Sequence, residues 1–270
     1  MKLALAQLSV GAADVRGNVE RAESAITTAA ARGADLVALP ELFDVGYFAF
    51  DSYARFAQGL GGDRLARLAE VAADHDVALL AGSVVEDLAA TAAETDVPTP
   101  ADEGLANTAV LFDADGRRQL VYRKHHLFGY GSTETELLTP GEGVPVTELG
   151  GFTVGVTTCY DLRFPELYRD LQAQGADMVL VPSAWPYPRV EHWQTLPRAR
   201  AIENLSYVAT INASADFDDA TLVGRSTVFD PWGTPVATTD DQPDLVVAEA
   251  DPDEVARVRD EFPALGDRRT

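Results

Sequence analysis

The chain has 270 residues, 46% of them hydrophobic, which is enough for one large domain with a buried core. Its 43 acidic and 21 basic residues give a net charge of −22, which disfavours nucleic acids and anionic membrane surfaces as partners. No apolar run of about 18 residues occurs, so no membrane-spanning helix is predicted. The apolar start at 3–6 is interrupted by Gln7 and favours a first strand over a signal peptide, so we expect a cytoplasmic protein.

Cysteine and lysine are both rare in this chain. Cys159 is the only cysteine, so it forms no internal disulfide, as is usual in a reducing compartment, and a lone cysteine is more often a buried hydrophobe than a nucleophile. Lysine occurs only as Lys2 and Lys124, which indicates that position 124 requires a compact charge. The acidic, lysine-poor composition also resembles that of proteins from salt-loving (halophilic) organisms, although a merely acidic surface explains it equally well.

Apolar runs alternate with helical patterns along the chain. In chain order the pattern predicts a strand at 3–10, a helix at 18–31, a strand at 34–39, a helix at 62–74, a strand at 77–85, a hairpin of 106–112 and 119–122, a strand at 152–158, a helix at 165–174, a strand at 177–181, a helix at 192–204, and strands at 207–212, 221–229, 235–238 and 245–249. Residues 87–103, rich in Ala, Thr, Pro and acids, are expected to form an exposed loop. This alternation indicates a layered α/β or α+β domain and leaves the number of layers open.

Three reactive side chains directly follow predicted strands. They are Glu41, Lys124 and Cys159. Sites in open sheets gather outside the carboxyl ends of strands, so these side chains are expected to converge. A carboxylate serves as general acid and base, a thiol with its pKa lowered by a neighbouring ammonium serves as nucleophile, and the ammonium stabilises an oxyanion. Together they are sufficient for acyl transfer through a covalent intermediate.

Other interpretations of these residues have weaker support. A glutamate after a strand is often solvated, and 123–126 (Arg-Lys-His-His) also resembles a basic surface patch or half of a metal site. Adjacent histidines point to opposite sides of an extended chain, and no HxH, HExxH or CxxC spacing occurs, so no metal is expected. The sequence has no nucleotide-binding glycine pattern and no G-x-S-x-G elbow, so we expect no cofactor and no serine nucleophile.

Five segments resemble, in the same order, motifs of the nitrilase (carbon–nitrogen hydrolase) superfamily. They are PELF at 40–43, YRKHHLF at 122–128, CYDLRFPELY at 159–168, RARAIEN at 198–204 and GRSTVFDPWG at 224–233. The resemblance implies an α+β fold, a four-layer α-β-β-α sandwich that pairs into a homodimer or a larger homo-oligomer. It covers a hydrolase domain at 1–250 and leaves 251–270 as a C-terminal tail at the surface or at the dimer interface.

The same resemblance implies catalytic roles. It assigns the triad to Glu41, Lys124 and Cys159, and a second glutamate beside the lysine to Glu134, with Glu136 as the alternative. In the expected mechanism, the cysteine attacks an amide carbonyl while the lysine and the backbone N–H of Tyr160 hold the oxyanion. The product is a carboxylate, released with ammonia through a thioester.

The substrate is expected to be a small linear amide that carries a carboxylate. The segment after the cysteine resembles the ω-amidase branch more than true nitrilases, in which Trp-Glu usually follows. Arg163 is expected either to bind the substrate carboxylate, as in carbamoylase relatives, or to pair with Glu166 or an acid of a dimer partner. Tyr47, Phe48 and Trp185 are expected to line the pocket, although aromatic rings also suit a core.

Four alternative functions remain open from the sequence. They are an N-carbamoyl amide hydrolase, a nitrilase, a thiol-dependent acyltransferase and a non-catalytic scaffold. Because all three triad positions are occupied by the expected residues, the scaffold is the least favoured of these.

Overall fold

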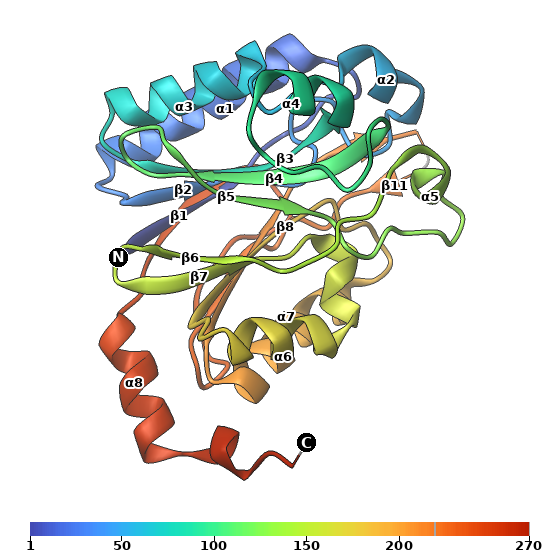
Figure 1. The fold of residues 1–270 in the computed structure, drawn as a ribbon. Helices are drawn as coiled ribbons and strands as arrows, with labels where there is room; N and C mark the ends of the chain where they lie inside the picture. The colour runs from blue at the N-terminus through green and yellow to red at the C-terminus, as the bar shows by residue number, and fades with distance from the viewer. Residues whose placement is uncertain (219, 270) are drawn as a thin grey trace.

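The computed structural model describes residues 1–218 and 220–269. Two six-stranded sheets form the inner layers of a sandwich, and helices cover the outer face of each (Figure 1). The first sheet contains, in spatial order, β14 (Asp244–Glu249), β1 (Lys2–Gln7), β2 (Leu36–Ala38), β3 (Ala78–Asp87), β4 (Leu105–Phe112) and β5 (Arg118–Arg123). The second contains β13 (Pro235–Thr238), β12 (Thr227–Phe229), β9 (Tyr207–Asn212), β8 (Met178–Ser183), β7 (Phe152–Val156) and β6 (Val146–Leu149).

The helices complete a four-layer arrangement. α1 (Val15–Ala31) and α3 (Asp63–Asp74) cover the first sheet, and α6 (Pro165–Ala173) and α7 (Val190–Asn204) cover the second (Figure 1). The shorter elements are η1 (Phe50–Ser52), α2 (Tyr53–Phe56), α4 (Leu88–Glu94), α5 (Glu134–Leu137), η2 (Cys159–Arg163), β10 (Asp216–Phe217), β11 (Ala220–Thr221), α8 (Pro252–Glu261) and η3 (Ala264–Asp267). The expected α-β-β-α sandwich is therefore confirmed. No helix within the described ranges is long and apolar enough to cross a membrane.

Strand β1 illustrates how the sequence pattern produces these layers. Leu3 and Leu5 belong to the core between the sheets, whereas Ala4 and Ala6 belong to the core beneath α1 and α3. All four side chains are fully buried, because β1 lies inside its sheet and both of its faces are covered. A strand buried on both faces appears in the sequence as an unbroken apolar run, and each buried leucine contributes about 1.5–3 kcal/mol.

The parallel strands at the centres of the two sheets bring their carboxyl ends together. β1, β2 and β3 are parallel in the first sheet, as are β7, β8 and β9 in the second. The chain beyond β2 meets the end of β8, where the Glu41 N–H donates to the Ser183 carbonyl at 3.4 Å. This meeting point is where the candidate site forms.

The segment 87–103 departs from the prediction of a loop, because its first half forms helix α4. The Asp87 side chain caps this helix by accepting from the Ala90 N–H at 3.0 Å. Leu88 and Thr91 are fully buried, and the Thr91 hydroxyl accepts from the Leu60 N–H at 3.0 Å. Alanine-rich composition favours helix, and this contact with the loop between α2 and α3 stabilises it.

The strand predicted at 221–229 is also shorter than expected. Gly224 and Arg225 have φ angles of 60° and 54°, which a strand does not accommodate, so the ladder with β9 begins only at Thr227. Strand β6, which was not predicted, forms an antiparallel edge on β7. The expected tail at 251–270 contains α8, whose Val255 and Val258 are buried, and its place at a dimer interface stays a prediction.

Candidate active site

Glu41, Lys124 and Cys159 lie together where the strands of both sheets end. Lys124 Nζ donates to Glu41 Oε1 at 2.8 Å, and the Cys159 thiol lies close enough to both charges for them to shift its pKa. The glutamate and lysine are each 1% exposed and the cysteine is 8% exposed. The convergence expected from the ends of three predicted strands is therefore present in the fold.

Tight backbone packing fixes the position of Glu41. Its Oε2 accepts from the Ala184 N–H at 2.9 Å, and Leu42, the next residue, turns the chain at a φ of 45°. The backbone of Leu39 approaches Gly82 so closely that a Cβ there would lie 1.7 Å from the carbonyl oxygen. Glycine at position 82 is therefore required for the chain to deliver Glu41 to the site.

Asn107 is a site residue that the sequence interpretation missed. Its Nδ2 donates to Glu41 Oε1 at 2.8 Å and lies 3.4 Å from Glu134 Oε1. The only sequence signal was a polar pair, Asn107–Thr108, within an otherwise apolar strand. Only the fold shows that this amide is 1% exposed and reaches between the two carboxylates.

Lys124 is held by two glutamates. Its Nζ lies 2.8 and 3.1 Å from the two carboxylate oxygens of Glu134, whose Oε2 also accepts from the Tyr47 hydroxyl at 2.9 Å. Glu136, the alternative, is exposed on the other side of α5. Glu134 is thus the glutamate in contact with the lysine, and its catalytic role stays a prediction.

Burial governs the electrostatics of this cluster. Burial raises the pKa of Glu41, Lys124 partly opposes this, and Glu134 adds to it. Burial alone would lower the pKa of Lys124, but Glu134 and Glu41 outweigh it and raise that pKa well above its usual value. Burial, and then Glu41, raise the pKa of the Cys159 thiol. Lys124 lowers it, but by less, so the expectation of a lowered thiol pKa is wrong. The resting nucleophile is therefore a thiol next to a base.

A buried carboxylate joins the nucleophile turn to the loop after Lys124. Cys159 itself adopts a φ of 48°, a conformation that costs a non-glycine residue about 1–2 kcal/mol. Asp161 Oδ2 accepts from the Thr158 N–H at 2.9 Å and from the Tyr122 hydroxyl at 2.6 Å. Its Oδ1 accepts from the His126 N–H at 2.9 Å. Asp161 was not singled out in the sequence, and these bonds hold the strained turn in place.

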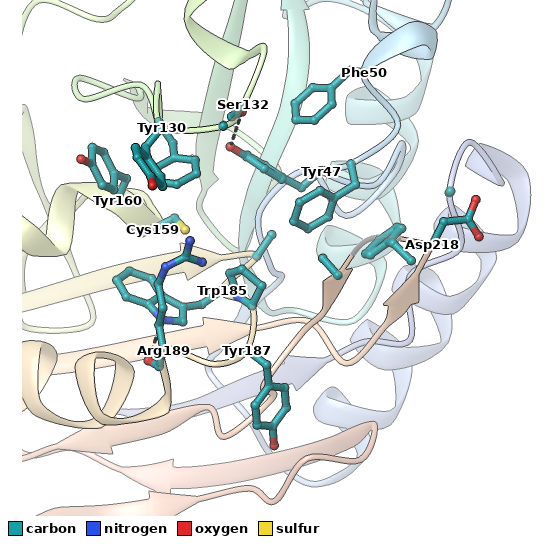
Figure 2. A pocket seen from close by; sticks show the side chains of 18 of the residues that line it. Tyr47, Phe50, Tyr130, Ser132, Cys159, Tyr160, Trp185, Tyr187, Arg189 and Asp218 are labelled. Carbon is teal, nitrogen blue, oxygen red and sulfur yellow. Dashed lines mark hydrogen bonds between the residues drawn. The ribbon is translucent and has the colours of Figure 1, made fainter.

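A cavity of about 570 Å³ opens over Lys124 and Cys159 (Figure 2). Of the residues expected to line it, the structure places Tyr47, Phe48, Tyr160, Arg163 and Trp185 there. Lining residues that were not predicted include Phe50, Phe128, Tyr130, Ser132, Tyr187, Arg189, Asp216, Phe217 and Asp218. Most come from loops far apart in sequence, so no local pattern identified them.

Arg163 faces the cavity without an acidic partner. Its guanidinium carbon lies 4.9 Å from the centre of the Trp185 ring, and its Nη2 lies 3.3 Å from His192 Nδ1. Among residues 1–218 and 220–269, no carboxylate oxygen lies within 4.0 Å of this guanidinium, so the alternative pairing with Glu166 is not formed within the chain. The arginine is thus free to meet an anion in the cavity.

The comparison with known families agrees with this geometry. The model of the carbon–nitrogen hydrolase family matches residues 2–260. The chain belongs to the carbon–nitrogen hydrolase family. The match extends ten residues past the expected domain end and includes most of α8.

Named relatives of this hydrolase include amidases. The 2-oxoglutaramate amidase of Paenarthrobacter nicotinovorans is 38% identical over 240 residues, which are 87% of this chain and 79% of that protein. Nit3 of Saccharomyces cerevisiae, a nitrilase-superfamily member, matches with a TM-score of 0.88 and 29% identity over 100% of this chain and 97% of that chain. An amidase from Nesterenkonia sp. AN1 matches with a TM-score of 0.82 and 29% identity over 98% and 99%. In a glutamine mutant of that amidase, acrylamide has added to the active-site cysteine.

Another buried carboxylate, Asp44, is expected to make the stability of this hydrolase depend on pH. Asp44 is 1% exposed and accepts from Arg64 Nε at 3.1 Å, and burial raises its pKa to about 6. The folded state then holds this proton more tightly than the unfolded chain, so the contribution of Asp44 to stability falls as pH rises from about 4 to about 6. Relative to Asp44→Asn, the wild type should lose about 2 kcal/mol between pH 4.5 and 7.5 in urea unfolding. An unchanged difference between the two proteins would contradict the raised pKa.

Proposed function

We propose that this chain hydrolyses the carbon–nitrogen bond of a small linear amide that bears a carboxylate, through a thioester on Cys159. The observation that carries the proposal is the buried ion pair of Glu41 with Lys124, next to Cys159, at the floor of an open cavity. Such a cluster contains a nucleophile, a base and an oxyanion-stabilising cation, and it excludes most water. Membership in the carbon–nitrogen hydrolase family supports the same reaction.

The proposed mechanism starts from an ionised Glu41 and a protonated Cys159. Glu41, ionised beside Lys124, takes the thiol proton of Cys159 as the sulfur attacks the amide carbonyl, and the oxyanion is held by the Lys124 ammonium and the Tyr160 N–H. Glu41 then gives this proton to the departing nitrogen, so that ammonia is released and a thioester is formed on Cys159. A water attacks the thioester and Glu41 takes one of its protons. As the C–S bond breaks, Glu41 returns this proton to the sulfur, and the released acid loses its own proton to solvent to give the carboxylate. Glu134 keeps Lys124 charged and oriented.

Two observations support a carboxylate on the substrate. Arg163 lines the cavity with no ion-pair partner among residues 1–218 and 220–269, and an anionic ligand would satisfy it. The relative that is 38% identical is a 2-oxoglutaramate amidase, which supports an ω-amide of a dicarboxylic acid. The aromatic lining, including Tyr47, Phe48 and Trp185, suits the short carbon chain between the two ends.

We also propose that the protein works as a homodimer or larger homo-oligomer in the cytoplasm. Three large apolar side chains, Ile202, Trp232 and Phe262, are 48%, 44% and 51% exposed, and the last two rings lie 6.2 Å apart. A patch of this kind on α7, the turn between β12 and β13 and the segment after α8 suits an interface between copies. A reducing compartment suits a free nucleophilic thiol. Light scattering in solution tests the assembly, and a mass near 28.9 kDa would contradict it.

Ammonia release from a substrate panel tests the proposed reaction. The panel contains ω-amides with a carboxylate, neutral amides of equal length, N-carbamoyl compounds and nitriles, each assayed at about 0.1 and 2 M KCl, because salt screens the acidic surface. We expect the carboxylate-bearing amides to be hydrolysed with the highest kcat/KM. Ammonia from nitriles or carbamoyl compounds alone would overturn the substrate, and acyl transfer to an added amine without hydrolysis would favour an acyltransferase.

A further inference from the structure

Two arginines share the wall of the cavity around Trp185, and the proposed reaction uses only one of them. The guanidinium carbon of Arg189 lies 5.6 Å from the centre of the Phe128 ring, and that of Arg163 lies over the rings of Trp185 and Tyr160. Both side chains are half-buried, and Figure 2 shows Arg189 on the same wall as Trp185, below Cys159. The structure thus places two cations against an apolar wall close to the nucleophile.

Neither guanidinium forms an ion pair with a carboxylate of the described residues. Within the described ranges, no carboxylate oxygen lies within 4.0 Å of Arg163 or Arg189, whereas nine other arginines form such ion pairs. Burial, together with the nearby charge of Arg189, also disfavours the cationic form of Arg163 and lowers its pKa. An anion bound between the two arginines would offset both the burial of the Arg163 charge and its repulsion from Arg189.

The backbone of Arg189 has a structural task, but its side chain does not. Its carbonyl oxygen accepts from Trp185 Nε1 at 3.0 Å, and the residue precedes the first turn of α7 without capping it through the side chain. Among the described residues the side chain makes no hydrogen bond, and it packs over Phe128 while lining the cavity. A substitution that keeps the backbone leaves the Trp185 bond in place.

We propose that Arg189 is a specificity-determining residue that, together with Arg163, binds the carboxylate end of the amide substrate. This inference rests on the proposed function. Two guanidiniums offer a carboxylate several charge-assisted hydrogen bonds in a fork geometry, and they give a neutral amide no comparable contact. The acid end would be bound on the Trp185 wall while the amide carbonyl lies at Cys159. The two arginines would therefore select amide substrates that carry an anionic group at the end opposite the amide.

Arg189→Gln tests the proposal through a ratio of kcat/KM values. Each protein is assayed with a carboxylate-bearing ω-amide and with the neutral amide of the same chain length. We expect the preference for the charged substrate to fall about ten- to hundred-fold, mainly through KM, because one charge-assisted contact is lost. Arg189→Lys keeps the positive charge but loses the forked geometry of the guanidinium, so it should retain part of the preference for the charged substrate. Arg198→Gln, which changes an exposed arginine of α7 outside the cavity, is the matched control and should keep the wild-type ratio.

The outcomes separate this proposal from the function on which it rests. Wild-type protein that hydrolyses no amide would overturn the proposed function itself. Wild-type protein that hydrolyses amides, with the same ratio in Arg189→Gln as in wild type, would overturn the role of Arg189 alone. A variant that loses activity equally on both substrates would show a merely structural role and would also overturn the proposal.

Discussion

Replacing Cys159 with alanine is expected to abolish turnover of every amide, with a loss on the order of 10⁶ in kcat. The chain has no second cysteine, so no covalent intermediate can form elsewhere through sulfur. The fold should persist, because alanine retains the Cβ and removes only a sulfur beside the cavity. Ammonia release and thermal unfolding, measured on the same preparation, check both parts of this expectation.

The single cysteine also allows the intermediate to be observed directly. Intact-mass measurement during turnover should detect one acyl adduct on the wild type and none on Cys159→Ala. Cys159→Ser is the matched control, since it keeps a hydroxyl nucleophile of similar size and should retain only a trace of activity. Turnover by the alanine variant at more than about a thousandth of the wild-type rate would contradict the nucleophile assignment.

Replacing Lys124 with alanine is expected to remove activity and stability together. The lost oxyanion contact should lower kcat by about 10²–10³, and more if the proton transfers at Glu41 are disturbed. The variant also leaves Glu41 and Glu134 buried without their shared cation, which should lower the free energy of unfolding by about 3–5 kcal/mol. Urea unfolding and ammonia release measure the two effects.

Lys2 provides an unusually well-matched control for this change. It is the only other lysine, and its amine lies 3.8 Å from a carboxylate oxygen of Glu249 at the surface. Lys2→Ala should therefore lower the free energy of unfolding by less than about 1 kcal/mol and leave the activity unchanged. Adding Glu134→Gln to Lys124→Ala removes one buried charge and should recover part of the stability without restoring turnover. A Lys124→Ala protein as stable as the wild type would show that the buried carboxylates do not depend on this cation.

The amino-acid sequence determined the chemistry that is available to this protein and the order of its elements. Glu41, Lys124 and Cys159 were predicted to converge because each follows an apolar run, and strands that end at one edge of a sheet bring their next residues together. The motifs around them identified the family, and the hairpin β4–β5 was predicted because its turn residues and apolar runs are adjacent in the chain. These features depend on neighbours along the sequence.

What only the tertiary structure decided depends on neighbours in space. The choice of Glu134 over Glu136 follows from which side of α5 faces Lys124, and the contact of Asn107 follows from the pairing of distant strands. The raised pKa of the Cys159 thiol reverses the sequence-based expectation, because burial by both sheets outweighs the nearby ammonium. The pairing of Arg163 with Arg189 in one cavity likewise brings together segments that no local pattern connects. Burial and distance set these energies, and both are properties of the packed fold.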